Sequence, residues 1–463
     1  MAAQSRAKVG WTSIVCFIII SLKTICDCTE EESRVLASDV ALKQARRKLD
    51  DIGGSISIDC GLPLGFSYTD EITDIIYTSD EELINTGVNK SISSKFKSGI
   101  LPKTLENVRS FPQGERNCYT LKPLEGNDTI YLIRALFMYG DYDDDDKLPE
   151  FDLYVGVNRW DNVRFDNASH VVIKEIIHLA LTGEIYVCLL NIGKGTPFIS
   201  ALELRHFHNT IYRTQPESAL VLYRRLDVGS TTNQTVRYKD DSYDRMWVPY
   251  PGSGSINTSS TVDSLLESEY RLPSKVMQTA AKPMNINGSL EFEFETGDSS
   301  LKFYVYMHFA ELEILQVNQY REFIIELNGN LWKESVVPEY LNSTTRFSKY
   351  PMKGSKLSFS LRKTSKSTLP PILNALEIYV LKDFLQASTD QGDVNAIMNI
   401  KSRYQVGEGW QGDPCEPKYS WDGLTCSYNG YDPPKIISLN LSSKGLAGRI
   451  VHSLYDLKSL QKL

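Results

Sequence analysis

The sequence lacks an apolar run long enough to cross a bilayer as a helix, which takes about 20 residues. Its longest uncharged run near the N-terminus covers residues 9–22, and Arg6 and Lys8 precede it. A basic flank before a short apolar run is typical of a secretory signal peptide. We therefore predict a signal peptide over residues 1–28, although "TICDCTE" is a poor cleavage site. An uncleaved anchor and a buried helix are the alternatives.

Catalytic motifs are also missing. The sequence has no Gly-x-Ser-x-Gly, no His-Glu-x-x-His, no Cys-x-x-Cys, and none of the Gly-rich loop, Val-Ala-Ile-Lys, His-Arg-Asp and Asp-Phe-Gly motifs of a kinase. Its net charge of −8 argues against a nucleic-acid partner, which needs a basic face. We expect a protein that is not an enzyme and has no cofactor.

Two groups of residues are weak candidates for a metal site. One acidic loop, "GDYDDDDKLPE", contains Asp141, Asp143, Asp144, Asp145 and Asp146. Its spacing differs from that of a calcium loop, so a solvated loop is the better interpretation. His206 and His208 share one face if they lie on a strand, but no third ligand is near them in sequence. We expect no metal at either position.

Cysteines are few, at eight in 463 residues, which excludes a disulfide-scaffold protein. The spacing leaves the pairing of Cys60, Cys118 and Cys188 open. A secreted chain is expected to carry N-linked glycans, and Asn-x-Ser/Thr sequons are frequent here. They occur at Asn89, Asn127, Asn167, Asn233, Asn257, Asn287, Asn342 and Asn440.

A module of about 170 residues is present twice. "YTDEITD" from Tyr68 matches "YKDDSYD" from Tyr238, and "IDCG" from Ile58 matches "LDVG" from Leu226. "FDLYVGVNRW" likewise matches "FIIELNGNLW", and "PFISALE" matches "PILNALE". The matches keep their order, with offsets of 168 to 174 residues. Chance does not explain this, so we infer an internal duplication.

The duplicated module has the pattern of antiparallel β-sandwiches. Apolar and polar residues alternate over 151–157, 291–294 and 301–309. Such alternation places one face of a strand in a core. Gly, Asn and Pro turns separate these strands, and no long helical periodicity appears between Gly54 and Leu381. The fold class predicted is all-β.

These segments, together with "SISIDCGLP", "SFPQGERNCYTL" and "YLIRALFMYGDYD", resemble the malectin-like ectodomains of plant receptor kinases. With "GWQGDPCEPKYSWDGLTC" after the pair, the order resembles the malectin-like, leucine-rich-repeat receptor-like kinase subfamily. The resemblance implies two tandem malectin-like β-sandwiches, module 1 at 54–212 and module 2 at 213–385. The charged segment 29–53 departs from the family, and is either a helical extension or a gene-reading error.

After the second module the pattern becomes helical, with Ile397, Ile400 and Tyr404 at helical spacing and Asp393 as a possible N-cap. We interpret residues 386–438 as a linker helix and the N-terminal cap of a leucine-rich solenoid. Cys415 and Cys426 flank Trp421 in this cap and are predicted to form a disulfide.

Residues 439–463 have the pattern of one leucine-rich repeat, with Leu463 placed 24 residues after Leu439. A solenoid needs about three repeats and terminal caps to bury its apolar faces. The sequence therefore predicts an incomplete repeat, from a natural truncation or a gene-model fragment ending before the transmembrane and kinase segments.

Candidate ligand contacts are the two matched Tyr-Asp pairs and one unmatched tryptophan. Aromatic rings stack on sugars, and carboxylates accept hydrogen bonds from their hydroxyl groups. However, duplicated residues are at least as suited to holding the fold. The candidates are Tyr68, Asp70, Tyr238, Asp240 and Trp247.

The first functional hypothesis is an extracellular recognition region of a plant receptor kinase, on the outer face of the plasma membrane. It would bind a peptide, a partner receptor ectodomain or a cell-wall glycan. The alternative is a stand-alone secreted carbohydrate-binding protein. Fold resemblance alone does not decide between them.

Overall fold

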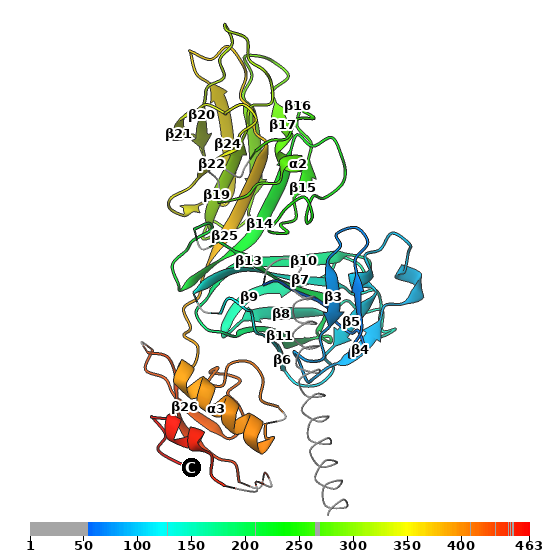
Figure 1. Ribbon diagram of the computed structural model, residues 1–463, viewed down its shortest axis with the longest axis vertical. Helices are drawn as coiled ribbons and strands as arrows, with labels where there is room; N and C mark the ends of the chain where they lie inside the picture. Colours follow the sequence, from blue (N-terminus) through cyan, green and yellow to red (C-terminus); the bar gives the residue numbers. More distant parts are fainter. Residues whose placement is uncertain are drawn as a thin grey trace, which may run out of the picture. The chain divides into compact units, whose positions relative to one another are not determined.

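The computed structural model describes residues 54–126, 128–208, 210–263, 269–407, 409–430, 432–442, 444, 446 and 449–463 (Figure 1). The predicted signal peptide, the segment 29–53 and the sequon at Asn127 lie outside the described residues. Within the described part, no helix is long and apolar enough to cross a membrane.

Module 1 packs two layers of strands around one apolar core. The first layer contains β1 (Ile56–Asp59), β2 (Ser67–Thr69), β3 (Ile76–Ser79), β7 (Thr129–Met138), β10 (Val171–Ala180) and β13 (Ala201–Phe207). The second contains β6 (Arg116–Leu121), β8 (Glu150–Val155), β9 (Asn158–Val163) and β11 (Ile185–Lys194). Beside them lie β4 (Val88–Ser91), β5 (Asn107–Ser110), β12 (Phe198–Ile199), η1 (Ser94–Phe96) and η2 (Lys103–Leu105).

Module 2 repeats this arrangement around a core of its own. Its first layer contains β14 (Ser218–Val228), β15 (Val248–Tyr250), β19 (Lys302–Phe309), β22 (Thr344–Phe347), β23 (Met352–Lys353) and β25 (Ala375–Asp383). Its second contains β18 (Leu290–Glu295), β20 (Phe323–Leu327), β21 (Asn330–Val336) and β24 (Lys356–Lys363). The remaining elements are β16 (Gly254–Asn257), β17 (Thr279–Lys282) and α2 (Ser274–Met277). The all-β fold class is confirmed.

Matched residues of the duplication have matched backbones. Gly61 and Gly229 have φ of +92° and +83°, a left-handed conformation that disfavours L side chains. A Cβ on Gly61 would lie 2.4 Å from the carbonyl oxygen of Val108, and one on Gly229 would lie 2.3 Å from the carbonyl carbon of Ala280. Both positions therefore require glycine for the same reason, a close approach of a neighbouring strand.

The two modules share one β-sheet. Strands β10 and β14 pair antiparallel, with Ile176 opposite Val221 and Ile177 opposite Leu220. The first layers of both modules thus form a continuous sheet in the order β2-β3-β1-β13-β7-β10-β14-β25-β19-β22. Because its hydrogen bonds continue across the junction, the sheet joins the sandwiches directly.

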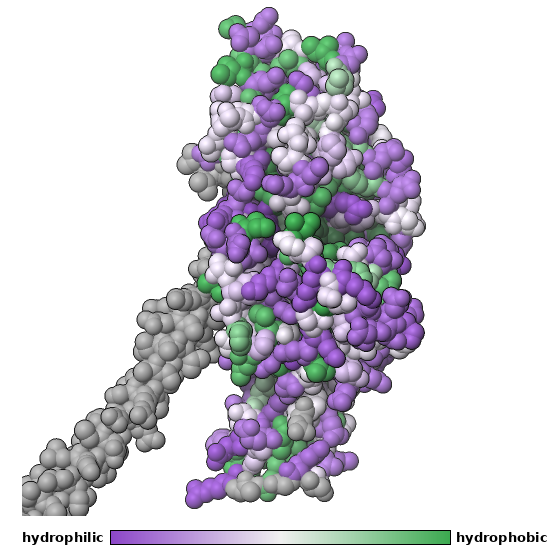
Figure 2. Space-filling view, turned by 90° about the vertical axis from the view of Figure 1, so that its right-hand side faces the viewer, coloured by the Kyte–Doolittle hydropathy of each residue, from purple (hydrophilic) through white to green (hydrophobic). Residues whose placement is uncertain are grey.

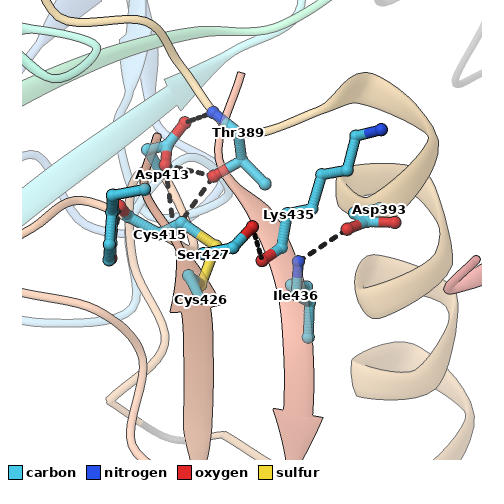
Figure 3. Close-up of a disulfide and its surroundings, with 9 residues drawn as sticks. Thr389, Asp393, Asp413, Cys415, Cys426, Ser427, Lys435 and Ile436 are labelled. Carbon is cyan, nitrogen blue, oxygen red and sulfur yellow. Dashed lines mark hydrogen bonds between the residues drawn. A yellow bond between two sulfur atoms is a disulfide. The ribbon is translucent and has the colours of Figure 1, made fainter. Parts of the chain in front are cut away.

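The segment after the modules folds around a small core of its own. It contains α3 (Gln391–Tyr404), β26 (Leu424–Ser427), β27 (Lys435–Leu439) and η3 (His452–Asp456). The N-cap of α3 is Asp390, whose side chain accepts from the amides of Gly392 and Asp393. The prediction of Asp393 as the cap is therefore wrong. Its carboxylate instead accepts from the amide of Ile436 at 2.6 Å, because Asp393 faces β27 (Figure 3).

A disulfide joins Cys415 and Cys426, the pair predicted from the sequence (Figure 3). Asp413 accepts from the amides of Thr389 and Cys415, which holds the start of this loop. A second disulfide joins Cys118 and Cys188, which lie opposite each other on β6 and β11. Cys60 is a buried free thiol.

Candidate functional site

The outer face of the shared sheet carries buried charges where the two modules meet. One face of the sheet packs on the two apolar cores, and side chains of opposite parity point the other way. On that second face, Arg134 of β7 lies opposite Glu175 of β10 and Glu203 of β13. Arg225 of β14 and Glu377 of β25 continue the row into module 2. All five side chains are at most 3% exposed.

Residues 236–247, which include the "YKDDSYD" repeat, cover these charges. The carboxylate of Asp244 accepts from Arg205 Nε at 2.8 Å, from Arg134 Nη1 at 3.1 Å and from Arg237 Nε at 2.8 Å. Because Arg134 and Arg205 belong to module 1 and Asp244 to module 2, this contact crosses the junction. We call the charged residues linked in this way the junction network. Its members are Arg134, Glu175, Glu203, Arg205, Arg225, Arg237, Asp244 and Glu377.

A second contact of the junction network crosses in the opposite direction. Arg225 of module 2 donates from Nη1 to Glu175 of module 1 at 2.7 Å and from Nε to Glu377 at 3.0 Å. Burying an ionised group is costly unless it is paired and hydrogen-bonded. Neither module alone contains the partners for all of these charges, so the network favours the joined arrangement.

The electrostatics of the junction network keep its carboxylates ionised. Burial alone would raise the pKa of Glu203, but Arg237, Arg134 and Arg205 outweigh it and lower the pKa to about 2. The same three arginines outweigh burial at Asp244 and hold its pKa well below the ordinary value. The network is therefore charged at neutral pH, and it binds protons only under strongly acidic conditions.

The structure places the first candidate pair, Tyr68 and Asp70, in the fold of module 1. The Tyr68 hydroxyl donates to Asp59 Oδ2 at 2.7 Å, and Lys103 Nζ lies 4.0 Å from the centre of its ring. The Asp70 carboxylate accepts from the amides of Ile72 and Thr73, which closes a turn. Both polar groups are already occupied by neighbours within the module.

Of the remaining candidates, Trp247 cannot contact a ligand. Its side chain is 0% exposed, and its Nε1 donates to Asp241 Oδ2 at 2.6 Å. The prediction of Trp247 as a ligand contact is wrong because its side chain is buried. Trp247 also has a counterpart in module 1, since Tyr77 lies 170 residues earlier and donates to Glu203 in the junction network. Tyr238 is half-buried, and the exposed Asp240 pairs with Lys275 at 3.0 Å.

Other singled-out residues are also held by neighbours. His208 Nε2 lies 2.9 Å from Arg271, and the His206 ring lies 5.9 Å from that of Tyr131. In the acidic loop, Asp141 accepts from the amide of Asp146.

Among the described sequons, five asparagines are exposed and two are half-buried. The exposed ones are Asn167, Asn233, Asn257, Asn287 and Asn440, and the half-buried ones are Asn89 and Asn342.

Pockets are shallow among the described residues. The better formed of them, of about 520 Å³, lies in the C-terminal segment and is lined by apolar side chains such as Ile400, Leu439 and Leu454. On the face drawn in Figure 2, hydrophobic residues form small groups among hydrophilic ones. These surfaces suit contact with a macromolecule better than enclosure of a small molecule.

Comparison with known proteins identifies relatives that match most of this chain. A family model, the malectin-like domain, matches residues 58–381. A putative leucine-rich repeat receptor-like protein kinase of Arabidopsis thaliana is 46% identical over 420 residues, which cover 90% of this chain and 48% of the relative. The receptor-like serine/threonine-protein kinase IOS1 of Arabidopsis thaliana is 42% identical over 89% of this chain and 46% of its own length.

Solved structures share the fold at low sequence identity. The ANX2 ectodomain from Arabidopsis thaliana superposes with a TM-score of 0.59 at 17% identity, covering 71% of this chain and 97% of the other. A complex of the plant peptide RALF23 with FER and LLG2 contains a chain that matches with a TM-score of 0.56, at 17% identity and over the same 71%. At a sequence identity of 17%, these matches establish a shared fold and nothing about function.

The chain spans about half the length of the curated relatives that it matches. Its matched region includes both modules and the shared sheet between them. The chain belongs to the malectin-like domain family, with strong homology to leucine-rich repeat receptor-like kinases of Arabidopsis thaliana.

Proposed function

We propose that this chain is a non-enzymatic recognition region of a receptor-like kinase, acting outside the cell, that binds a peptide or a partner ectodomain. The homology to receptor kinases over 90% of the chain supports the receptor setting. A similar fold occurs in a complex of FER with the peptide RALF23 and LLG2. In this setting residues 1–28 are the signal peptide, and the parent receptor continues into membrane and kinase segments.

One observation favours macromolecular recognition: the two modules share a sheet and a buried junction network. A rigid surface loses little conformational entropy when a partner binds, which favours affinity. We further propose that residues 386–438 cap a leucine-rich solenoid whose first turn begins at residue 439. The parallel pairing of Ser438 with Lys462, a turn later in the chain, supports this.

The alternative, a secreted carbohydrate-binding protein, is disfavoured by the candidate residues themselves. Tyr68 and Asp70 bond within their module, and Trp247 is buried. A glycan site would need exposed aromatic faces and free polar groups.

The test is a binding screen with the full secreted chain. Purified extracellular peptides and receptor ectodomains form one panel, and a glycan array forms the other. We expect saturable binding to a member of the first panel and none to the array. Saturable glycan binding with no peptide or ectodomain bound would instead favour the carbohydrate-binding alternative.

A further inference from the structure

One segment of module 2 has a charge opposite to that of the whole chain. Residues 340–376 contain seven basic and no acidic residues, although the chain has a net charge of −8. Two of the seven form ion pairs, Lys356 with Glu293 and Arg362 with Glu326. The seven are Arg346, Lys349, Lys353, Lys356, Arg362, Lys363 and Lys366.

Part of this charge gathers with a lysine from another strand. Lys333 of β21 donates from Nζ to the carbonyl oxygen of Phe347 in β22 at 3.1 Å. Burial lowers the pKa of Lys333, and the nearby charges of Arg346 and Lys349 lower it further. Among the described residues, no carboxylate forms an ion pair with these three cations. Three like charges thus lie together without a counterion in the described part of the chain.

Aromatic side chains lie among these cations. The Phe347 ring is 41% exposed and stacks on Tyr306, with centroids 5.8 Å apart and an interplanar angle of 19°. Tyr350 is 79% exposed. The ring of Trp332 lies 4.9 Å from Lys333 Nζ. We call Trp332, Lys333, Arg346, Phe347, Lys349 and Tyr350 the β21–β22 surface.

The chemistry of the β21–β22 surface selects its partner. Gathering like charges is unfavourable, and carboxylates of a partner would relieve the repulsion. Exposed rings beside the cations gain by burial against apolar side chains, and aromatic and arginine residues are enriched at binding hot spots. An anionic polysaccharide supplies carboxylates and sugar faces that can stack on one side of a ring, but it has no apolar side chains to bury Phe347 and Tyr350 more fully. An acidic polypeptide with interspersed apolar residues supplies both.

We propose that the β21–β22 surface binds an acidic polypeptide segment of a partner protein, with apolar side chains between its carboxylates. The proposal rests on the proposed function and names the chemistry of the partner. It assigns specificity to the cations and additional affinity to the rings.

The probe is a soluble random copolymer of glutamate and tyrosine, compared with polyglutamate and polygalacturonate. Binding of the full chain is measured at about 0.05 and 0.15 M salt, since ionic screening weakens exposed charge contacts. The Arg346→Glu/Lys349→Glu variant should bind the copolymer at least about tenfold more weakly. A matched control, Lys95→Glu/Lys147→Glu, makes the same charge change at side chains 75% and 79% exposed and should stay within about twofold.

A third variant, Tyr350→Ala, tests the ring. It should weaken binding of the copolymer while leaving polyglutamate binding unchanged. Equal melting temperatures of all variants establish that they fold. The proposal is overturned if the copolymer does not bind, if the control loses as much affinity as the surface variant, or if polygalacturonate binds more tightly than the copolymer.

These outcomes are separate from the test of the proposed function. A peptide or ectodomain that binds the wild-type chain and the Arg346→Glu/Lys349→Glu variant equally would overturn this assignment while the proposed function stands. Copolymer binding that depends on Arg346 and Lys349 would support the assignment even where the partner screen finds only glycans, in which case the proposed function alone fails.

Discussion

Replacing Asp244 with asparagine is expected to lower the free energy of unfolding by about 3–5 kcal/mol, the usual cost of breaking a buried charge cluster by removing one partner. Arg134, Arg205 and Arg237 all donate to this carboxylate, and removing its charge leaves Glu203 and Glu175 to balance three positive charges. Asparagine tolerates the φ of +54° at this position and is nearly isosteric, so the backbone is preserved. Urea unfolding of the full chain measures the loss.

The matched control for this substitution is Asp240→Asn, four residues earlier in the same segment. Asp240 is 47% exposed and pairs with Lys275, whose side chain is 52% exposed. An exposed pair contributes at most about 1 kcal/mol. Equal losses in the two variants would show that the junction network does not stabilise the joined modules.

The second large effect is pH-dependent and is centred on Asp59 in module 1. The pKa of Asp59 is raised to about 7, chiefly by burial. The hydrogen bond from Tyr68 and the charge of Lys103 lower this pKa, whereas the charges of Asp80 and Glu106 raise it. In the unfolded chain the pKa is about 3.9. The folded state therefore binds more protons between these values. The protonated carboxyl of Asp59 therefore contributes to the stability of the fold below pH 4, and this contribution is lost as the pH rises through 7.

Asp59→Asn removes this titration while keeping an oxygen that accepts from Tyr68. Relative to wild type, the variant should gain about 3 kcal/mol in free energy of unfolding between pH 5 and pH 8, since the wild type titrates over about two pH units in this range and each unit corresponds to about 1.4 kcal/mol. Comparing the two proteins at each pH cancels the titration of histidines such as His178 and His308, whose pKa values are lowered by burial. Parallel stability curves would mean that Asp59 is ionised in the folded protein at pH 5.

Local sequence pattern was enough to predict several of the strands and the duplication. Alternating apolar residues locate β8, β18 and β19, because one face of each packs on a core. The pairing of β10 with β14 was not predictable in this way. Ile177 and Leu220 are apolar, which indicates burial but does not identify the strand that lies opposite.

One feature of the amino-acid sequence indicated the junction network, and the sequence analysis did not use it. Arg134 is the only charged residue in "TIYLIRALFM", which forms the fully buried strand β7. A lone arginine in an apolar strand needs a buried carboxylate, and Glu175 and Glu203 supply it. The third partner, Asp244, comes from the other module and could not be inferred, because the long-range pairing that brings it close is not encoded in local pattern.

The role assigned to Trp247 failed for a related reason. Comparing identical residues between the modules left this tryptophan without a match, whereas comparing aromatic residues pairs it with Tyr77. Both are buried, with Tyr77 bonded to Glu203 and Trp247 packed beside Arg225 and His308. Duplicated positions conserve a role in packing more strictly than they conserve the residue type.

Amide hydrogen exchange across the junction tests most directly whether the two modules form one rigid body. Sheet amides that open only with global unfolding exchange slowly, whereas those at a flexible hinge exchange quickly. We predict that the amides of β10 and β14 around Ile176, Ile177, Leu220 and Val221 exchange as slowly as those of β7 and β19 within the modules. Alternate amides of a central strand bond to opposite neighbours, so the amides that point from β10 to β14 and back are the informative ones. Rapid exchange at these amides, with slow exchange in β7 and β19, would contradict the account and show two sandwiches that move independently.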